Sequence, residues 1–229
     1  MKDNLEIELD DYIKNSNESF FVVQIGANDG KMADPIYNKA VRYGWGGVLV
    51  EPVKYLYDRL VNNYKNTNTS LKFENSVITT HTGTIDFYQF PVELESDEEF
   101  PFWANGMGSI LKPFNSPGHN TLKNKNFEMV KQKTPCLTFE DLIRKYNVNN
   151  IDLLQIDIEG YDGTLLTSID FSSIKPKFIR YEDKHIDTAL RDGLTTVSSQ
   201  QVVEYLKANG YHVGDRSNGF DRVCKLKNL

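Results

Sequence analysis

The sequence has few cysteines, no excess of positive charge and no long hydrophobic run. Its two cysteines, Cys136 and Cys224, match neither a disulfide framework nor the spacing of zinc ligands, which fits a reducing compartment. The net charge of −6 argues against unspecific binding to nucleic acid or to anionic membranes. No run approaches the length of a membrane span, and the N-terminal residues contain no signal-peptide core. We therefore expect a soluble, cytoplasmic protein with a small or neutral partner.

The composition is that of a globular protein with a sizeable core. With 229 residues, 39% hydrophobic and 12% aromatic, the chain can fold as a single domain over residues 1–229. We expect a helix within residues 1–19 to precede the first strand. Residues 91–135 are expected to be an insertion into this domain.

Short apolar runs alternate with segments that have helical periodicity. We expect strands at residues 20–25, 47–50, 71–78, 83–90, 151–156, 178–181, 211–213 and 220–226. Helices are expected after Asp34-Pro35, from residue 53, after the N-cap Thr138 and after the N-cap Ser198. This alternation predicts an α/β fold with a parallel, doubly wound sheet, closed by an antiparallel edge. Ligands of such sheets bind beyond the carboxyl ends of the strands.

The expected insertion loses periodicity and contains an acidic run, an aromatic and glycine-rich stretch and a lysine-rich run over residues 123–133. Segments of this kind are lids, binding loops or connectors, and charge runs are typical of solvated surface. Trp103 can offer a platform for a sugar ring, and His119 can reach an acceptor. The alternative, which we favour, is that Phe100, Phe102 and Trp103 pin the insertion onto the core.

The first strand runs into the loop Gly26-Ala27-Asn28-Asp29-Gly30. Glycines at this place let the backbone turn tightly and approach a ligand. The loop lacks the G-x-G-x-x-G spacing of a dinucleotide site, and Asp29 would repel a diphosphate. It therefore suits a cationic or zwitterionic ligand.

Glu51 ends the second strand, 21 residues after Gly30. An acid near that separation accepts hydrogen bonds from both hydroxyls of a ribose. The alternative is a carboxylate placed at a helix N-terminus, where negative charge is favourable. A glycine loop, a ribose-binding acid and no phosphate site together indicate S-adenosylmethionine (SAM).

Three motifs carry a resemblance to a known family. The segments "QIGANDG", "VEP" and "DLLQIDIEGYDGTLL", in this order, resemble the FkbM family of SAM-dependent methyltransferases. The similarity runs from Phe20 to Ser168 and more weakly to Leu226. It implies a Rossmann-like class I methyltransferase fold, with a mostly parallel seven-stranded sheet and helices on both faces. It also implies methyl transfer to a hydroxyl oxygen, often on a saccharide or a small natural product.

The resemblance also implies where the cofactor would bind. The residues expected to contact the methionine part, the ribose, the adenine and the sulfonium are, in chain order, Gln24, Gly26, Ala27, Asn28, Gly30, Glu51, Pro52, Asn75, Ser76, Val77 and Asp157. Gln24 departs from the family, which more often has an acid at this position, although a glutamine can still accept and donate there. The stretch Met107-Gly108-Ser109 resembles one that family members place near the cofactor.

Two later strands end in acids and a histidine. Methyl transfer to oxygen needs an aligned acceptor and a group that takes the hydroxyl proton. The catalytic candidates are Asp157, Glu159, Asp183 and His185. The base is His185 or one of the carboxylates; the alternatives are a surface histidine, and for Glu159 a helix N-terminal charge.

The same strand ends can be interpreted as a cation site. Asp157, Glu182 and Asp183 offer oxygen ligands of the kind that Mg²⁺ prefers. The motif around Asp157 otherwise resembles the metal-free pattern, so we do not favour a metal.

Two further functions remain as alternatives to the methyltransferase. One is a non-catalytic module that keeps the fold and the cofactor, against which the acids after both later strands argue. The other, weaker, is a nicotinamide-dependent oxidoreductase. The sequence does not specify the methyl acceptor.

Overall fold

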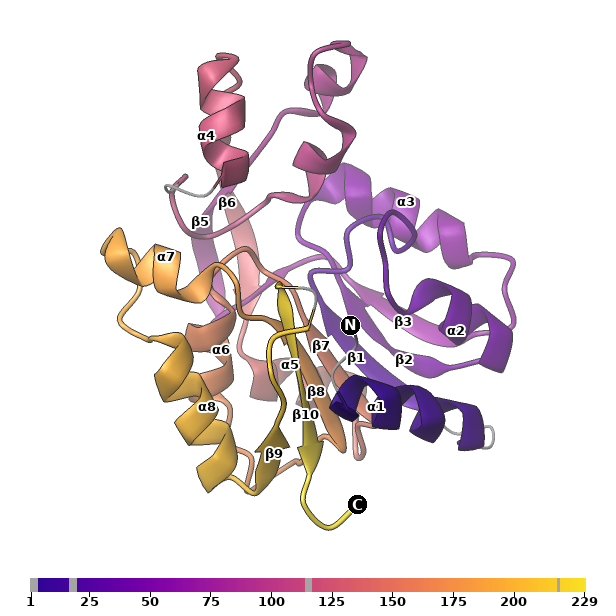
Figure 1. Cartoon of the computed structure of the whole chain (residues 1–229). Coiled ribbons are helices and arrows are strands. Elements are labelled where there is room, and N and C mark those ends of the chain that lie inside the picture. Colours follow the sequence, from indigo (N-terminus) through magenta and orange to yellow (C-terminus); the bar gives the residue numbers. More distant parts are fainter. Residues whose placement is uncertain (1–3, 17–19, 114–116, 218) are drawn as a thin grey trace.

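The computed structural model describes residues 4–16, 20–113, 117–217 and 219–229. A seven-stranded sheet with the order β3-β2-β1-β7-β8-β10-β9 forms its centre (Figure 1). These strands are β1 (Phe21–Ile25), β2 (Gly46–Val50), β3 (Ser70–Glu74), β7 (Leu153–Ile156), β8 (Phe178–Glu182), β9 (Tyr211–Val213) and β10 (Asp221–Leu226). The pairs from β3 to β8 are parallel, and β10 is antiparallel to both β8 and β9. The predicted α/β fold with an antiparallel edge is therefore confirmed.

The central strands are apolar along their whole length because both of their faces are covered. Val23 of β1 pairs with Val48 of β2 on one side and with Leu154 of β7 on the other, and all three side chains are fully buried. This register brings the carboxyl ends of β1, β2 and β7 to one edge of the sheet, and the loops that follow these strands share that edge.

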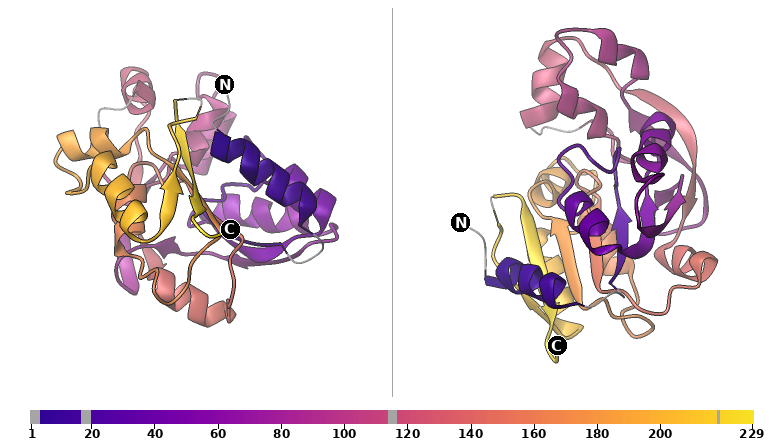
Figure 2. Two further views of the ribbon diagram at one scale, coloured as in Figure 1. Left: turned by 60° about the horizontal axis from the view of Figure 1, so that its bottom comes forward. Right: turned by 90° about the vertical axis from the view of Figure 1, so that its right-hand side faces the viewer.

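Helices cover both faces of the sheet (Figure 2). One face packs against α1 (Asn4–Asn15), α2 (Tyr37–Tyr43) and α3 (Lys54–Tyr64). The other packs against α5 (Phe139–Tyr146), α6 (Asp162–Ser168), α7 (Ile186–Arg191) and α8 (Ser199–Ala208). The helix expected within residues 1–19 is α1, while positions 1–3 and 17–19 lie outside the described residues. Across the described chain, no helix is both long and apolar enough to cross a bilayer.

Two helix starts follow their predicted caps. Thr138 accepts a hydrogen bond from the backbone N–H of Asp141 at the start of α5. Ser198 and Gln201 form a reciprocal capping box at the start of α8. Cys136 and Cys224 are both buried and form no disulfide.

A smaller sheet with the order β4-β6-β5 stands beside the large one. It consists of β4 (Val77–Ile78), β5 (Gly83–Gln89) and β6 (Val130–Leu137). Between β5 and β6 the chain forms η1 (Val92–Ser96), η2 (Phe102–Gly106) and α4 (Pro117–Asn124), which rise above the carboxyl edge of the large sheet (Figure 1). We call residues 90–129 the cap; its small core includes Phe90, Phe100, Ala104, Met107 and Leu122.

Two boundaries expected from the sequence were wrong. The insertion does not extend to residue 135, because Val130–Leu137 pairs with β5 along its length, from Gly83 opposite Cys136 to Gln89 opposite Val130. Most of this strand is exposed, so its lysines and proline gave it no hydrophobic pattern. The expected strand at 71–78 is instead two strands in different sheets, because the chain leaves the large sheet at Asn75-Ser76.

Candidate active site

The loop after β1 fits between the ends of β2 and β7. Its Gly26 and Ala27 N–H groups both donate to the carbonyl oxygen of Val50, at 3.1 and 2.9 Å. Gly26 has a φ of +83°, and a Cβ at this position would lie 1.8 Å from the carbonyl oxygen of Asp157. Only glycine fits here. Asn28 also has a left-handed φ of 50°, as its residue type allows.

Gly30 occupies a different place from the one expected. It is not among the described residues that line the cavity at this edge of the sheet. A Cβ on Gly30 would lie 2.3 Å from Leu60 Cδ1 and 2.9 Å from the ring of Tyr64. Gly30 therefore lets the loop close onto α3 and does not face the candidate ligand site.

Glu51 is buried at the point where the loop, β2 and α3 meet. Its Oε2 accepts a hydrogen bond from the Asn28 N–H at 2.8 Å, and its Oε1 accepts one from the Val53 N–H at 2.8 Å. Burial raises the pKa of Glu51 to about 7, against the effect of these two N–H donors. The carboxylate thus serves the start of α3 and also lines the cavity, so the two interpretations of Glu51 do not exclude each other.

The residues that follow β3 have two different roles. The Asn75 side-chain amide donates to the carbonyl oxygens of Glu51 and Pro52, at 2.8 and 3.0 Å, and Asn75 does not line the cavity. Ser76 and Val77 do line it, as Pro52 does. Asn75 therefore holds the Glu51 segment in place, and only its two successors face a ligand.

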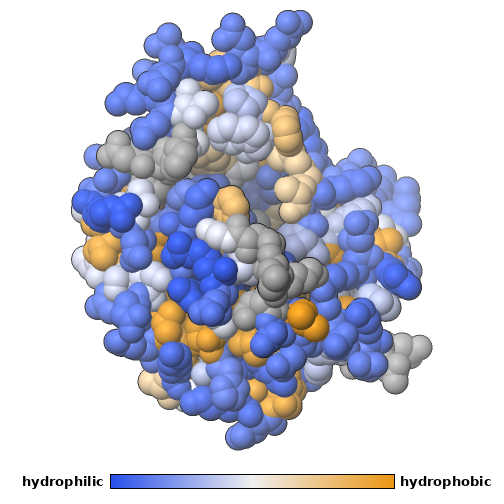
Figure 3. Space-filling model, in the orientation of Figure 1, coloured by the Kyte–Doolittle hydropathy of each residue, from blue (hydrophilic) through white to orange (hydrophobic). Residues whose placement is uncertain are grey.

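The cavity lies between the carboxyl edge of the large sheet and the cap, where the surface is hollowed (Figure 3). Its walls include Gln24, Gly26, Ala27, Asn28, Asp34, Glu51, Pro52, Ser76, Val77, Gln155, Asp157, Glu159 and Tyr161. Four of these residues are acids, and no lysine or arginine is found among the described residues of the lining. Within the described chain, the buried Gln24 Oε1, Ser76 Oγ and Gln155 Oε1 atoms make no hydrogen bond. The cavity thus combines negative charge with unsatisfied polar atoms, which a cationic ligand rich in donors would complement.

The side of the cavity formed by the cap is partly aromatic. Phe102 and Trp103 of η2 line the cavity with 72% and 39% of their surfaces exposed. We expected Phe100, Phe102 and Trp103 to anchor the insertion by packing against the core. Only Phe100 is buried in this way, in the core of the cap. Gly108 and Ser109 also line the cavity, whereas Met107 packs inside the cap.

Asp183 was wrongly expected to be a catalytic and a metal-binding residue. Its side chain is fully buried, and it accepts hydrogen bonds from Ser199 Oγ, from Arg216 and from Arg222. The two arginines lie 2.7 and 2.8 Å from the same oxygen, Oδ2. Asp183 is therefore the centre of a structural ion-pair network and does not line the cavity.

The other expected catalytic residues lie closer together. Asp157 and Glu159 follow β7 and line the cavity. Glu182 ends β8, and its Oε1 is 3.6 Å from Nε2 of His185, which precedes α7. His185 does not line the cavity, and burial lowers its pKa to about 4. His119 of the cap is buried, and burial lowers its pKa to about 4 as well.

Several of the lining residues were not expected from the sequence. Gln155 lies inside an apolar strand, and Tyr161 lies within the acidic motif but was not singled out there. Met32 and Ala33 reach the cavity from the long segment between β1 and α2.

Burial raises the pKa of Asp157, Glu159 and Glu182, and their mutual repulsion raises it further in Glu159 and Glu182. The Asp157 side chain is exposed to the cavity, and the cavity walls surround it. In the unfolded chain such groups are ionised above about pH 5. Above neutrality the folded state therefore binds more protons than the unfolded state, so the free energy of unfolding falls as the pH rises. The histidines act in the opposite direction, but only below about pH 6.5.

We therefore expect Glu182→Gln to raise the melting temperature of the ligand-free protein at pH 8. Each pKa unit contributes about 1.4 kcal/mol, and 1 kcal/mol shifts the melting temperature by about 2–4 °C, so a rise of about 3 °C or more is expected. Circular dichroism at pH 8 with a chelator present measures it. Glu204→Gln on the exposed side of α8 is the control and should change little. A Glu182→Gln protein no more stable than the wild type at pH 8 would contradict the raised pKa.

Comparison with known proteins is consistent with this geometry. A family model described as the methyltransferase FkbM domain matches residues 24–213. Among solved structures, methyltransferase FkbM from Methylobacillus flagellatus KT aligns with a TM-score of 0.52 and 15% identity, over 92% of this chain and 44% of that chain. The citrinin polyketide synthase CMeT domain gives a TM-score of 0.48 and 11% identity, over 97% of this chain and 51% of that chain. A structure of LepI in complex with SAM gives a TM-score of 0.44 and 12% identity, over 97% of this chain and 46% of that chain.

The chain thus spans about half the length of these structures or less. No significant match is found among curated proteins. The likeness to the Methylobacillus structure shows a shared fold, which agrees with the seven-stranded sheet described above. Because the family model covers residues 24–213 of 229, the chain belongs to the methyltransferase FkbM domain family.

Proposed function

We propose that this protein transfers a methyl group from SAM to a hydroxyl oxygen of a saccharide or small-molecule acceptor. The observation that carries the proposal is the cavity lining: four carboxylates, no basic side chain among its described residues, and three buried polar atoms without partners. A sulfonium with an amino-acid tail and a ribose suits such a lining. The diphosphate of a nicotinamide cofactor would meet negative charge, with no lysine or arginine among the described lining residues to offset it.

Each part of the lining has a distinct role in this proposal. The loop Gly26-Ala27-Asn28, with Gln24 and Asp34 behind it, faces the amino-acid end, and the unpartnered Gln24 Oε1 can accept from the ammonium group. Glu51 accepts from the ribose hydroxyls, because each carboxylate oxygen keeps lone-pair capacity beyond its single N–H partner. Ser76 and Val77 flank the adenine. The proposed contacts thus follow the order of the strand ends across the sheet.

The acceptor would enter between the cap and the ends of β7 and β8. The exposed faces of Phe102 and Trp103 suit a sugar ring or another flat acceptor. SAM supplies an activated methyl group: the acceptor oxygen bonds to the methyl carbon as the carbon–sulfur bond breaks. This chain must hold the acceptor in line and take its proton.

Two carboxylates that line the cavity are the candidates for that proton. Asp157 and Glu159 face the cavity, whereas His185 lies behind them. Their raised pKa values bring them closer to the working pH, as general bases require. We therefore place the base at Asp157 or Glu159, with His185 outside direct reach of the acceptor.

Incubation with SAM labelled in its methyl group, together with a set of saccharides and hydroxylated small molecules, tests the proposal. Labelled product whose methyl is on oxygen supports it. Binding of the cofactor with no product from any acceptor would favour the non-catalytic module, and a methyl on nitrogen or carbon would contradict the assignment to oxygen.

A further inference from the structure

Glu159, Glu182 and His185 form a compact group behind the cavity. One ligand atom from each lies within 4.8 Å of the other two. Glu159 comes from the loop after β7, Glu182 ends β8, and His185 immediately precedes α7. Glu159 also lines the cavity, so the group opens onto the candidate active site on one side.

Glu182 has unsatisfied capacity for a ligand. The residue is 9% exposed, and its Oε2 makes no hydrogen bond within the described part of the chain. Its Oε1 lies 3.6 Å from His185 Nε2, which is too long for a hydrogen bond. A buried carboxylate in this condition is costly unless something compensates it.

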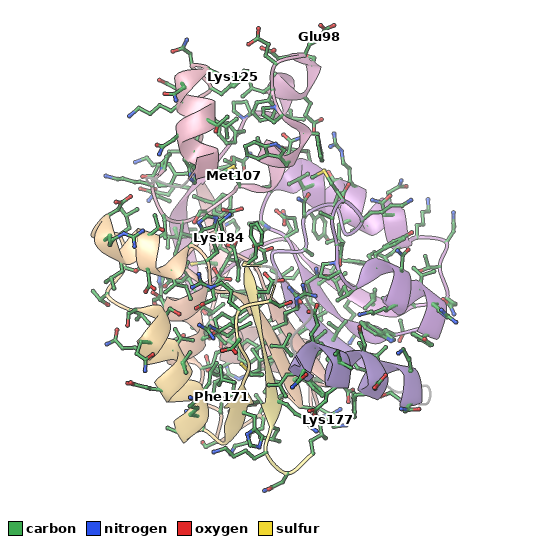
Figure 4. The ribbon with its side chains drawn as sticks, viewed as in Figure 1. Glu98, Met107, Lys125, Phe171, Lys177 and Lys184 are labelled. Carbon is green, nitrogen blue, oxygen red and sulfur yellow. The ribbon has the colours of Figure 1, made fainter. Side chains whose placement is uncertain are left out.

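Most of the ionisable side chains around Glu182 are acids. Besides Glu159, the carboxylates of Asp157, Asp162 and Asp221 repel the charge on Glu182. Of the nearby cations, Arg180 donates two hydrogen bonds to Asp221. The Nζ atom of Lys184 lies 4.0 Å from the ring centroid of Phe220. In Figure 4, Lys184 is seen below Met107 of the cap. Within the described residues Arg180 pairs with Asp221 and not with Glu182, while the charge of Lys184 acts on Glu159.

The backbone fixes the position of Glu159. This residue adopts a left-handed φ of 56°, which is unfavourable for a side chain of this kind. The fully buried Asp162 holds the loop by accepting from the N–H groups of Ile158 and Gly160, at 3.3 and 3.1 Å. The Glu159 carboxylate is therefore presented by a constrained loop.

We propose that Glu159, Glu182 and His185 bind one divalent transition-metal cation of the Mn²⁺ class. Two carboxylate oxygens suit a hard cation, and the imidazole nitrogen favours a first-row transition metal over Mg²⁺. His185 contributes an imidazole nitrogen, a common ligand of first-row transition metals. This set differs from the one expected from the sequence, because Asp157 and Asp183 are not part of it.

The role of such a cation rests on the proposed function. Three protein ligands leave coordination positions for other oxygens, and Glu159 places them beside the cavity. An acceptor hydroxyl bound there would have a lowered pKa. Its proton would pass to the neighbouring Asp157, and its oxygen would bond to the methyl carbon while the carbon–sulfur bond breaks.

Titration of metal-free protein with MnCl₂, followed by electron paramagnetic resonance of the free ion, tests the site without any methyl transfer. We expect one Mn²⁺ per chain, with binding weakened at least about tenfold in Glu182→Gln and in His185→Ala. The matched controls are Glu204→Gln and His212→Ala, two exposed positions far along the chain from the group, which should bind as the wild type does.

The result that would overturn the proposal is wild-type protein that binds no stoichiometric Mn²⁺, or variants that bind it unchanged. If one variant shows no cooperative thermal unfolding, the other decides the outcome. Calorimetry with S-adenosylhomocysteine (SAH) on the same samples measures cofactor binding separately, so a failed metal site and a failed cofactor site give different results.

Discussion

Glu51→Ala is expected to weaken the binding of SAH at least about 100-fold, because the two proposed hydrogen bonds from ribose hydroxyls to the ionised carboxylate would contribute about 1.5–3 kcal/mol each. The substitution also removes the acceptor of the Asn28 N–H, which positions the loop against the ligand. Isothermal titration calorimetry measures the change directly. An alanine variant that binds SAH as the wild type does would remove Glu51 from the ribose site.

The control variant for this experiment should also replace a buried glutamate, but one outside the cavity. Glu74 ends β3, is 7% exposed and accepts hydrogen bonds from Lys145 and Tyr146. It does not line the cavity. Glu74→Ala should therefore lower stability without changing SAH affinity. A similar loss of affinity in both variants would point to general destabilisation.

Asp183→Ala is expected to lower the free energy of unfolding by about 3–5 kcal/mol, because it removes a fully buried carboxylate that pairs with two partly buried arginines. Arg216 and Arg222 both donate to Asp183 Oδ2, and the Asp183 side chain is fully buried. Urea denaturation followed by circular dichroism measures the loss. Asp141→Ala is the control, because Asp141 pairs with Arg144 at the surface, and it should cost about 1 kcal/mol or less.

The outcome separates a structural from a catalytic role for Asp183. A structural residue predicts large destabilisation, with methyl transfer retained in the fraction that remains folded at low temperature. A variant as stable as the wild type that has lost methyl transfer would return Asp183 to the catalytic candidates.

Local signals explain why much of the fold was predictable. The strands β1, β2 and β7 are continuous apolar runs, because both of their faces are buried. The starts of α5 and α8 are each encoded by a capping pair whose two residues are three positions apart in sequence. The Gly26 loop and Glu51 follow their strands directly, so the order of the sequence placed them at one edge of the sheet.

Features that depend on contacts distant in sequence were not predictable in this way. The strand β6 is specified by its pairing with β5, more than 40 residues away, and its own residues are mostly exposed. Gly30 packs against Leu60 and Tyr64 of α3, which are distant from it in sequence. The cap core likewise joins residues from 90 to 129.

The strand geometry could have corrected one expectation. Successive residues of an extended chain point to opposite sides, so Glu182 and Asp183 at the end of β8 do not share a site. In the structure Glu182 joins Glu159 and His185, and Asp183 turns to Arg216 and Arg222. From the two adjacent acids alone, the sequence did not show which one would lie near Glu159.

Calorimetric titration of the wild-type protein with SAH, set beside the same titration with NAD, tests the central claim most directly. We predict that SAH binds at one site per chain and raises the melting temperature, and that NAD gives neither effect. Binding of NAD with no binding of SAH would contradict the assignment of the acidic cavity to SAM.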